Sequence, residues 1–150
     1  MSFDPIDRPG IYLTPVWEDE DLFEVEVCAT DGRFAGIARC YTTREQIAEL
    51  ARTVDRFPKS TSDLLRFSTD TGGKFSSFDL HFRCIDGRGG VVVRVKVAER
   101  VHYSNAPGID NVVEFDLGVE PASIDNFSSQ LAAMAQAKIG EKRAVLHGKT

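Results

Sequence analysis

FDLHFRC (residues 78–84), VVVRVKV (91–97) and VEFDLGV (113–119) are three stretches in which apolar and polar residues alternate. A period of two places the apolar set on one face of a β-strand and the polar set on the other. If Val95 lies opposite Leu80 on one side and Phe115 on the other, the polar residues form the rows Asp79–Lys96–Glu114 and His81–Arg94–Asp116. Opposite charges on facing strands contribute about 0.2–1 kcal/mol each. The pattern therefore predicts an antiparallel meander with a defined register.

A second alternating pair precedes the meander. Residues 22–29 and 34–41 flank the turn sequence TDGR at 30–33, and that turn length would place Glu24 opposite Arg39. The small residues Gly36 and Ala38 predict that something large, such as a helix, lies close over that face. Residues 11–16 predict a short strand that Pro15 moves toward the sheet edge.

Two segments have helical spacing. Thr42 and Glu45 fit a capping box with Thr42 at the N-cap, and Pro58 stops the helix that follows. Pro121 suits the first turn of a second helix, which ends before Gly140. Its apolar stripe comprises Ile124, Phe127, Leu131, Met134 and Ala135. A short strand is expected over 63–68, and loops over 69–74, 86–89 and 102–111.

The order is strands, helix, strands, helix. We expect a single α+β domain over 1–150: a mainly antiparallel sheet of about six to seven strands with two amphipathic helices packed on one face. Residues 1–10 are expected to be an irregular lead-in, and 138–150 a basic, partly disordered tail.

Composition narrows the function classes. The net charge of −5 argues against binding the nucleic-acid backbone, which needs clustered Lys and Arg. No apolar run reaches the ~20 residues of a membrane span, and the start MSFDPIDRPG does not resemble a secretory signal, so we expect a cytoplasmic protein with no membrane partner. The three cysteines include no CxxC pair and are expected to be reduced thiols.

The sequence offers no catalytic or metal-binding motif. HExxH, GxSxG and EF-hand patterns are absent, and the three histidines are scattered, so no metal or cofactor is expected. Asp86–Gly90 is Gly-rich but lacks P-loop spacing and fits a hairpin turn. His81 lies beside carboxylates in the predicted sheet, which is the arrangement of a general base, but a solvated and self-neutralised face favours a structural role. We expect a protein that is not an enzyme.

The segment Trp17-Glu18-Asp19-Glu20-Asp21 places the only tryptophan beside four carboxylates. One interpretation is a solvated acidic loop with the indole tucked against the core edge. The other is a contact site for a basic protein partner, because aromatic anchors rimmed by charge are favoured at interfaces and acidic clusters steer basic partners.

The pattern as a whole resembles a known group. It has an acidic strand pair over 23–36, a helix ending in Phe57-Pro58, three long strands, and a last helix with Ile124, Phe127 and Leu131. This order of elements resembles small bacterial domains of unknown function that are grouped with immunity proteins of polymorphic toxin systems. The resemblance implies a non-enzymatic protein that binds and neutralises a partner toxin. No binding residue can be carried over from it.

We therefore expect a non-catalytic protein-binding module with Trp17, Glu18, Asp19, Glu20 and Asp21 as its contact residues. The alternative is a small-ligand carrier or enzyme with a pocket between sheet and helices, where Gly36, Ala38 and Ala48 would leave space. A second alternative is a self-associating subunit that uses an exposed edge strand.

Overall fold

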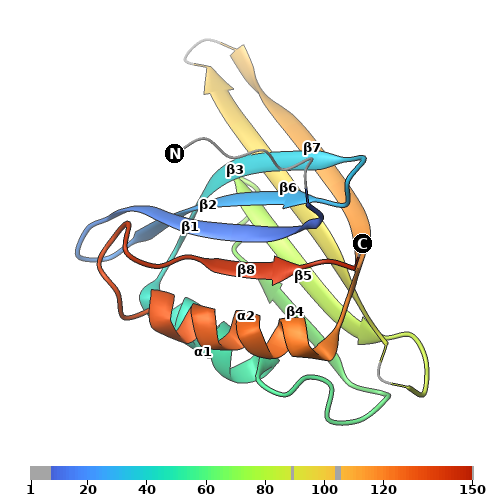
Figure 1. The fold of residues 1–150 in the computed structure, drawn as a ribbon. Helices are drawn as coiled ribbons and strands as arrows, with labels where there is room; N and C mark the ends of the chain where they lie inside the picture. The colour runs from blue at the N-terminus through green and yellow to red at the C-terminus, as the bar shows by residue number, and fades with distance from the viewer. Residues whose placement is uncertain (1–7, 89, 104–105, 150) are drawn as a thin grey trace.

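The computed structural model describes residues 8–88, 90–103 and 106–149. Within these residues, eight strands form two antiparallel sheets of four, accompanied by two helices. The α+β class with antiparallel strands is confirmed, with the strands divided between two sheets rather than placed in one (Figure 1).

Sheet A has the strand order β3–β2–β1–β8, and sheet B has the order β4–β5–β6–β7. The strands of sheet A are β1 (Gly10–Glu18), β2 (Phe23–Thr30), β3 (Ala35–Thr42) and β8 (Ala144–His147). Those of sheet B are β4 (Leu64–Ser68), β5 (Ser77–Cys84), β6 (Val91–Tyr103) and β7 (Ala106–Val119). The helices are α1 (Arg44–Val54) and α2 (Pro121–Met134).

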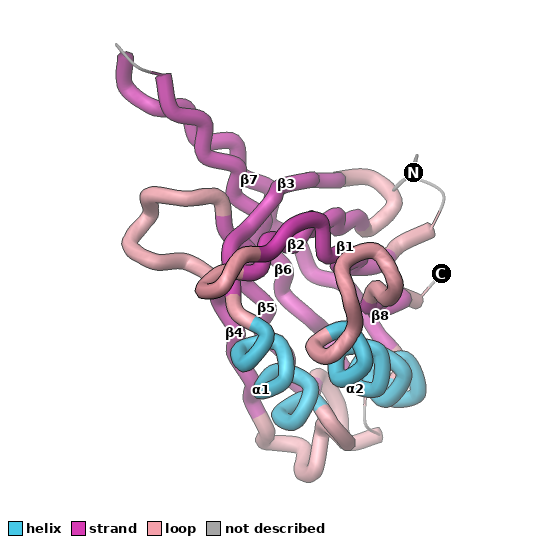
Figure 2. Tube along the Cα trace, turned by 90° about the vertical axis from the view of Figure 1, so that its left-hand side faces the viewer, coloured by secondary structure: helices cyan, strands magenta, loops and turns pink. Residues whose placement is uncertain are grey.

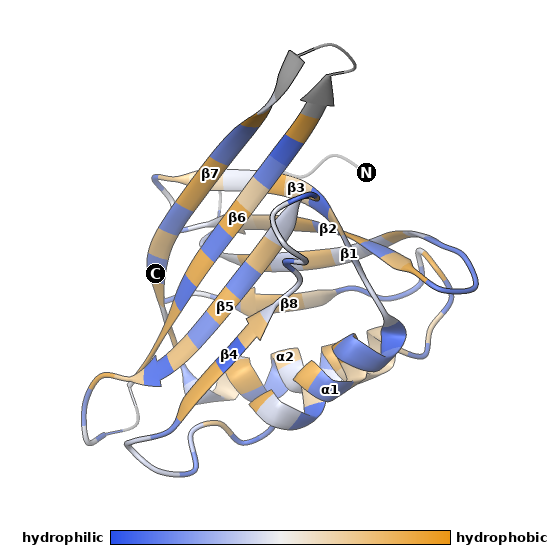
Figure 3. Cartoon of the chain, turned by 180° about the vertical axis from the view of Figure 1, so that it is seen from behind, coloured by the Kyte–Doolittle hydropathy of each residue, from blue (hydrophilic) through white to orange (hydrophobic). Residues whose placement is uncertain are grey.

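The predicted register of the meander is confirmed. Val95 lies opposite Leu80 and Phe115, which sets the rows Asp79–Lys96–Glu114 and His81–Arg94–Asp116. The Arg94 guanidinium joins both rows, with Nε 3.3 Å from Glu114 Oε2 and Nη1 3.4 Å from Asp116 Oδ2. Figure 3 shows the alternation of hydrophilic and hydrophobic residues along these strands.

The expected loop over 102–111 is wrong, because the ladder continues to the pair Tyr103 and Ala106. The pairing shifts register between Val101 and Tyr103, opposite Pro107, and proline within a sheet is tolerated at such irregularities and on edge strands like β7. The resulting hairpin projects well beyond sheet A (Figure 1).

The register predicted for the first hairpin is wrong by two residues. Arg39 lies opposite Glu26, with Nε 3.1 Å from Oε2, and Glu24 lies opposite Tyr41. The connection is longer than expected because Asp31 Oδ1 accepts hydrogen bonds from the backbone N–H groups of Arg33 and Phe34, which closes a loop over 31–34. A shift of two leaves every side chain on its predicted face.

The large neighbour over Gly36 is the second sheet and not a helix. A Cβ at Gly36 would lie 2.5 Å from Val113 Cγ1 and 3.5 Å from Val97 Cβ. The strand β3 therefore crosses directly over β6 and β7, and only a residue without a side chain permits this approach.

The prediction for the C-terminal end needs correction, and the one for the N-terminal end falls mostly outside the described residues. Residues 144–147 are the strand β8, paired with β1 from Leu13 to Gly10, so the segment expected to be a partly disordered tail contributes a largely buried strand. Gly10 begins β1, while residues 1–7 of the expected lead-in lie outside the described residues, as does Thr150.

The first helix begins one residue later than expected. Thr42 still pairs with Phe23 in the sheet, so Thr43 becomes the N-cap and Gln46 completes the capping box. In the second helix Pro121 occupies the first turn, and the predicted stripe is buried, as expected. The helices pack on each other, α2 also contacts β8, and together they lie at one side of the two sheets (Figure 2). One continuous core draws on both sheets and both helices.

Candidate functional site

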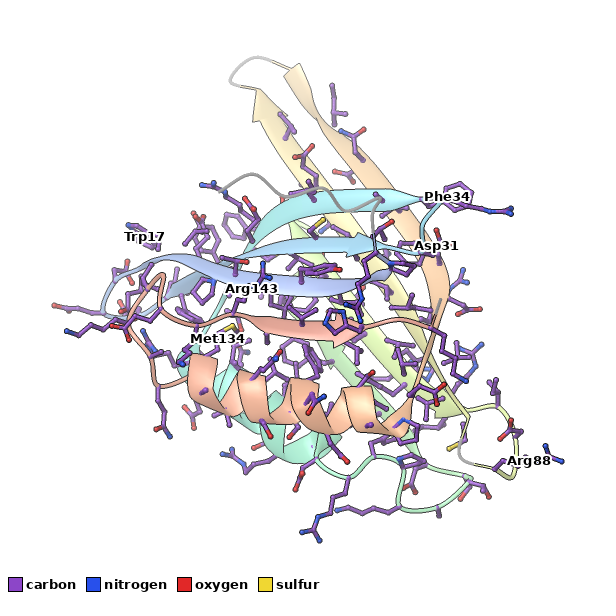
Figure 4. The ribbon with its side chains drawn as sticks, viewed as in Figure 1. Trp17, Asp31, Phe34, Arg88, Met134 and Arg143 are labelled. Carbon is purple, nitrogen blue, oxygen red and sulfur yellow. The ribbon has the colours of Figure 1, made fainter. Side chains whose placement is uncertain are left out.

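The side chain of Trp17 lies at the end of β1 and is 46% exposed. A register shift between Pro15 and Trp17 brings Trp17 opposite Glu24, on the outer face of sheet A. Figure 4 shows the indole projecting away from the sheet. The indole is therefore available for contact and is not tucked against the core edge.

Two of the four predicted carboxylates stabilise the turn between β1 and β2 and its attachment to α1. Glu18 accepts hydrogen bonds from Arg44 Nε at 2.8 Å and Nη2 at 3.0 Å, and these bonds hold the pKa of Glu18 below its usual value. Asp19 Oδ1 accepts from the backbone N–H groups of Leu22 and Asp21, which lowers the pKa of Asp19. Both groups therefore keep their negative charge to lower pH than an unpaired carboxylate of the same kind does.

The other two carboxylates, Glu20 and Asp21, lie at the exposed tip of the turn. In the part of the chain that the structure describes, no ion pair joins either of them to a cation. Their charges are therefore free to act on an approaching molecule.

Glu24 lies between two aromatic residues on the outer face of sheet A. It pairs with Trp17 on one side and with Tyr41 on the other. Two strand spacings separate the backbones of Trp17 and Tyr41 by roughly 10 Å. A cationic side chain placed over Glu24 would meet a carboxylate and two aromatic rings, and both attract cations.

Beside this row is an apolar groove of about 530 Å³. One wall is Tyr41, whose ring meets that of Phe75 edge to face, with centroids 5.9 Å apart and planes at 89°. Leu22, from the acidic turn, lines another part of the groove, so turn and groove form one continuous surface. The remaining lining is rich in hydroxyl groups and comes from the start of α1 and the loop over 68–76.

Arg100, in β6, holds the loop that carries Phe75. Its side chain is 12% exposed. Its Nη1 donates to the Phe75 carbonyl at 2.8 Å and to Ser77 Oγ at 3.0 Å. Asp70 Oδ1, 3.8 Å from the same nitrogen, accepts from the Gly73 N–H. The groove wall is therefore fixed to the base of the long hairpin.

Sequence reasoning found Trp17 and the acidic turn but missed the groove. The available signals were Tyr41, which falls on the polar face of its strand, and Phe75, which follows Gly72 and Gly73 in an otherwise polar loop. Neither signal says that the two rings meet, because they are far apart in the chain.

His81 and the two buried cysteines, which are the candidate catalytic groups, have surroundings that disfavour their charged forms. His81 lies in a row with Arg66 and Arg94, and burial together with Arg66 and Arg83 lowers its pKa. Burial raises the pKa of Cys28 and of Cys40 to about 12, so neither is an activated thiolate. Among residues 8–88, 90–103 and 106–149, no cluster of potential metal ligands occurs and no helix has the length and apolarity to cross a membrane.

Comparisons of the chain with protein-family models, with curated proteins and with solved structures gave no match.

Proposed function

We propose that this chain is a non-catalytic binding module that recognises a basic protein. The observation that carries the proposal is the exposed indole of Trp17, in one row with Glu24 and Tyr41, next to an acidic turn and an apolar groove. Glu20 and Asp21 attract the partner over long range, and cationic side chains lie over Glu24 between the rings. An apolar side chain of the partner enters the groove beside Phe75. The resemblance to immunity proteins makes a toxin the favoured partner, which the module neutralises by covering it.

The test begins with a partner captured from the native host and continues with binding kinetics. Charge reversal in the double variant Glu20→Lys/Asp21→Lys is expected to slow association, because it replaces long-range attraction of the basic partner with repulsion. Within the described residues, these two side chains make no structural contact that the substitution would break. The effect should fade as the Debye length falls from ~10 Å at 0.1 M salt to ~3 Å at 1 M. Trp17→Ala is expected to act on dissociation and to cost about 2 kcal/mol or more.

The matched control reverses two exposed carboxylates at the helix ends remote from Arg44 and Ala135, in the double variant Asp55→Lys/Asp125→Lys, and changes the net charge by the same amount. This variant should associate at nearly the parent rate. Equal slowing by both double variants would show that total charge matters and not this surface.

A second candidate function is small-ligand binding, which the size of the groove favours. Ligand sites span about 300–1,000 Å³, and the groove of about 530 Å³ falls within that range. It lies at the start of α1 and not between the sheet and the helix faces, where a ligand pocket was expected. Native mass spectrometry of the purified protein distinguishes the two functions: a bound organic molecule lost in Phe75→Ala would favour the carrier.

A further inference from the structure

The core face of the long hairpin continues beyond the point where sheet A covers it. Val97 and Val113 lie beneath Gly36 of β3. The next pairs on the same face are Glu99 with Asn111 and Val101 with Ile109. Ile109 is 47% exposed although it belongs to the apolar side of the ladder. In a packed pair of sheets this face is normally covered by a strand of the opposite sheet.

The edge strand of sheet A beside this face is β3, and its outer edge pairs with no other strand of the described residues. The backbone N–H of Asp31 donates to the Phe34 carbonyl, which fixes the hydrogen-bond alternation of the β2–β3 ladder. Counting from that pair, Gly36, Ala38 and Cys40 bond to β2. The alternate residues of β3 point their backbone N–H and C=O groups to the outer edge; these residues are Ala35, Ile37, Arg39 and Tyr41. Within the described ranges, none of these backbone groups makes a hydrogen bond at that edge.

A hollow of about 230 Å³ lies between this edge and the hairpin. It is lined by Gly36 and Ile37 on one side and by Glu99, Asn111 and Val112 on the other. Among the described residues that line the hollow, Glu99 is the one with a charge. The larger groove beside Tyr41 lies at the other end of the same strand. A strand rises about 3.3 Å per residue, so a segment as long as β3 reaches from one hollow to the other.

We propose that an extended segment of the basic partner adds to the edge of β3 as a fifth strand of sheet A. Its backbone pairs with the free groups of Ala35, Ile37, Arg39 and Tyr41. Its apolar side chains cover Val113 and Ile109, and a basic side chain faces Glu99. This proposal rests on the proposed function, in which the partner is basic. A basic segment complements the charge of this acidic chain, whereas a second copy of the chain would repel it.

The experiment uses a capped peptide of alternating lysine and valine, as long as β3, and the isotope-labelled full chain. We expect amide resonances of Ala35, Ile37, Arg39 and Tyr41 to shift and their hydrogen exchange to slow on binding. The control peptide has the same sequence with alternate backbone nitrogens methylated. It keeps the charge and side chains but cannot pair, so its affinity should be lower by about tenfold or more.

Protein variants give an independent readout. Ile37→Pro removes an outward N–H that β2 does not use, and proline is tolerated at such an edge position. It should weaken binding of the unmethylated peptide by about tenfold or more, whereas Ile37→Thr, which keeps the N–H, should weaken it much less. The peptide comparison on the parent protein remains decisive if Ile37→Pro does not fold.

Three results would overturn the proposal. Equal binding of both peptides with shifts confined to 18–24 would leave the acidic contact surface standing without strand addition. Exchange protection at the β3 edge that grows with concentration of the chain alone would show that a second copy occupies the edge. Loss of the captured partner in Glu20→Lys/Asp21→Lys but full binding in Ile37→Pro would uphold the proposed function and reject the added strand.

Discussion

Gly36 shows how one residue sets the distance between the two sheets. Its missing side chain lets β3 approach Val113 and Val97 on the crossing strands. Ala38, two residues on, is buried at the same interface. The packing of the sheets at this corner therefore depends on small side chains in β3.

We predict that Gly36→Ala destabilises the protein by about 1–3 kcal/mol, because its Cβ would overlap Val113 Cγ1 and overpacking has costs of that size. Urea unfolding measures the change. The matched control is Gly87→Ala, where a Cβ would meet no atom within 4 Å. The double variant Gly36→Ala/Val113→Ala should recover part of the loss; no recovery would contradict the overlap as the cause.

Two histidines connect stability to pH. His81 has its pKa lowered by burial and by Arg66 and Arg83, and His147 by burial and by Arg8 and Arg143. The folded state therefore binds their protons less readily than the unfolded state does. As the pH falls below the usual value of 6.5, the unfolded state is protonated first, and stability decreases.

We predict that the free energy of unfolding falls between about pH 7 and pH 5, and that His81→Gln/His147→Gln flattens this slope. Urea unfolding across that range is the measurement. Carboxylates with lowered pKa, such as Asp31 and Asp63, lose their contributions only at more acidic pH, so the two windows are separate. An unchanged slope in the double variant would assign the effect to other groups.

At the scale of elements, the last strand and the last helix complete the core together. Leu146 of β8 and Phe127 of α2 are both fully buried. Gln130 Oε1 of α2 accepts a 2.7 Å hydrogen bond from the Val145 N–H, which joins the two elements. The basic end of the chain is thus part of the fold.

We predict that Leu146→Ala costs about 2–5 kcal/mol and Phe127→Ala about 3–5 kcal/mol, the range for large-to-small changes in a core. Lys142→Ala, an exposed change just before β8, should stay within about 0.5 kcal/mol. Denaturant melts at one temperature compare the three. A melt of Leu146→Ala that matches the parent would show that β8 is peripheral.

The whole molecule has a single core despite its two sheets. Buried residues from sheet A, sheet B, α1 and α2 belong to one continuous cluster. Neither sheet buries its inner face alone: the crossing at Gly36 covers one side, and the helices cover the other. Each part therefore depends on the others for burial.

We predict one cooperative unfolding transition. Trp17 fluorescence reports on sheet A, far-ultraviolet circular dichroism on the helices, and the resonances of Phe78 and Phe82 on sheet B. The three midpoints should coincide in urea. Separate midpoints for the tryptophan and for the two phenylalanines would contradict a shared core.

The sequence by itself determined the strand faces, the meander register and the buried stripes of both helices. Alternation and helical spacing report which side of an element avoids water, and charge pairs along 78–119 define one register. It also pointed to Trp17 and the acidic turn, since exposed charge next to an aromatic residue is visible locally. The two-residue error at Arg39 arose because the Asp31 side chain closes a loop over 31–34, which is longer than the tight turn that the sequence predicted.

Only the tertiary structure decided how these pieces meet. Division into two sheets, the crossing of β3 over Val113, and the place of β8 beside β1 depend on contacts between residues distant in the chain. The groove formed by Tyr41 and Phe75 arises in the same way, because Arg100 of β6 positions a loop against the end of β3. Periodicity describes which face of an element is apolar, but the partner that covers it is chosen by packing of the whole chain.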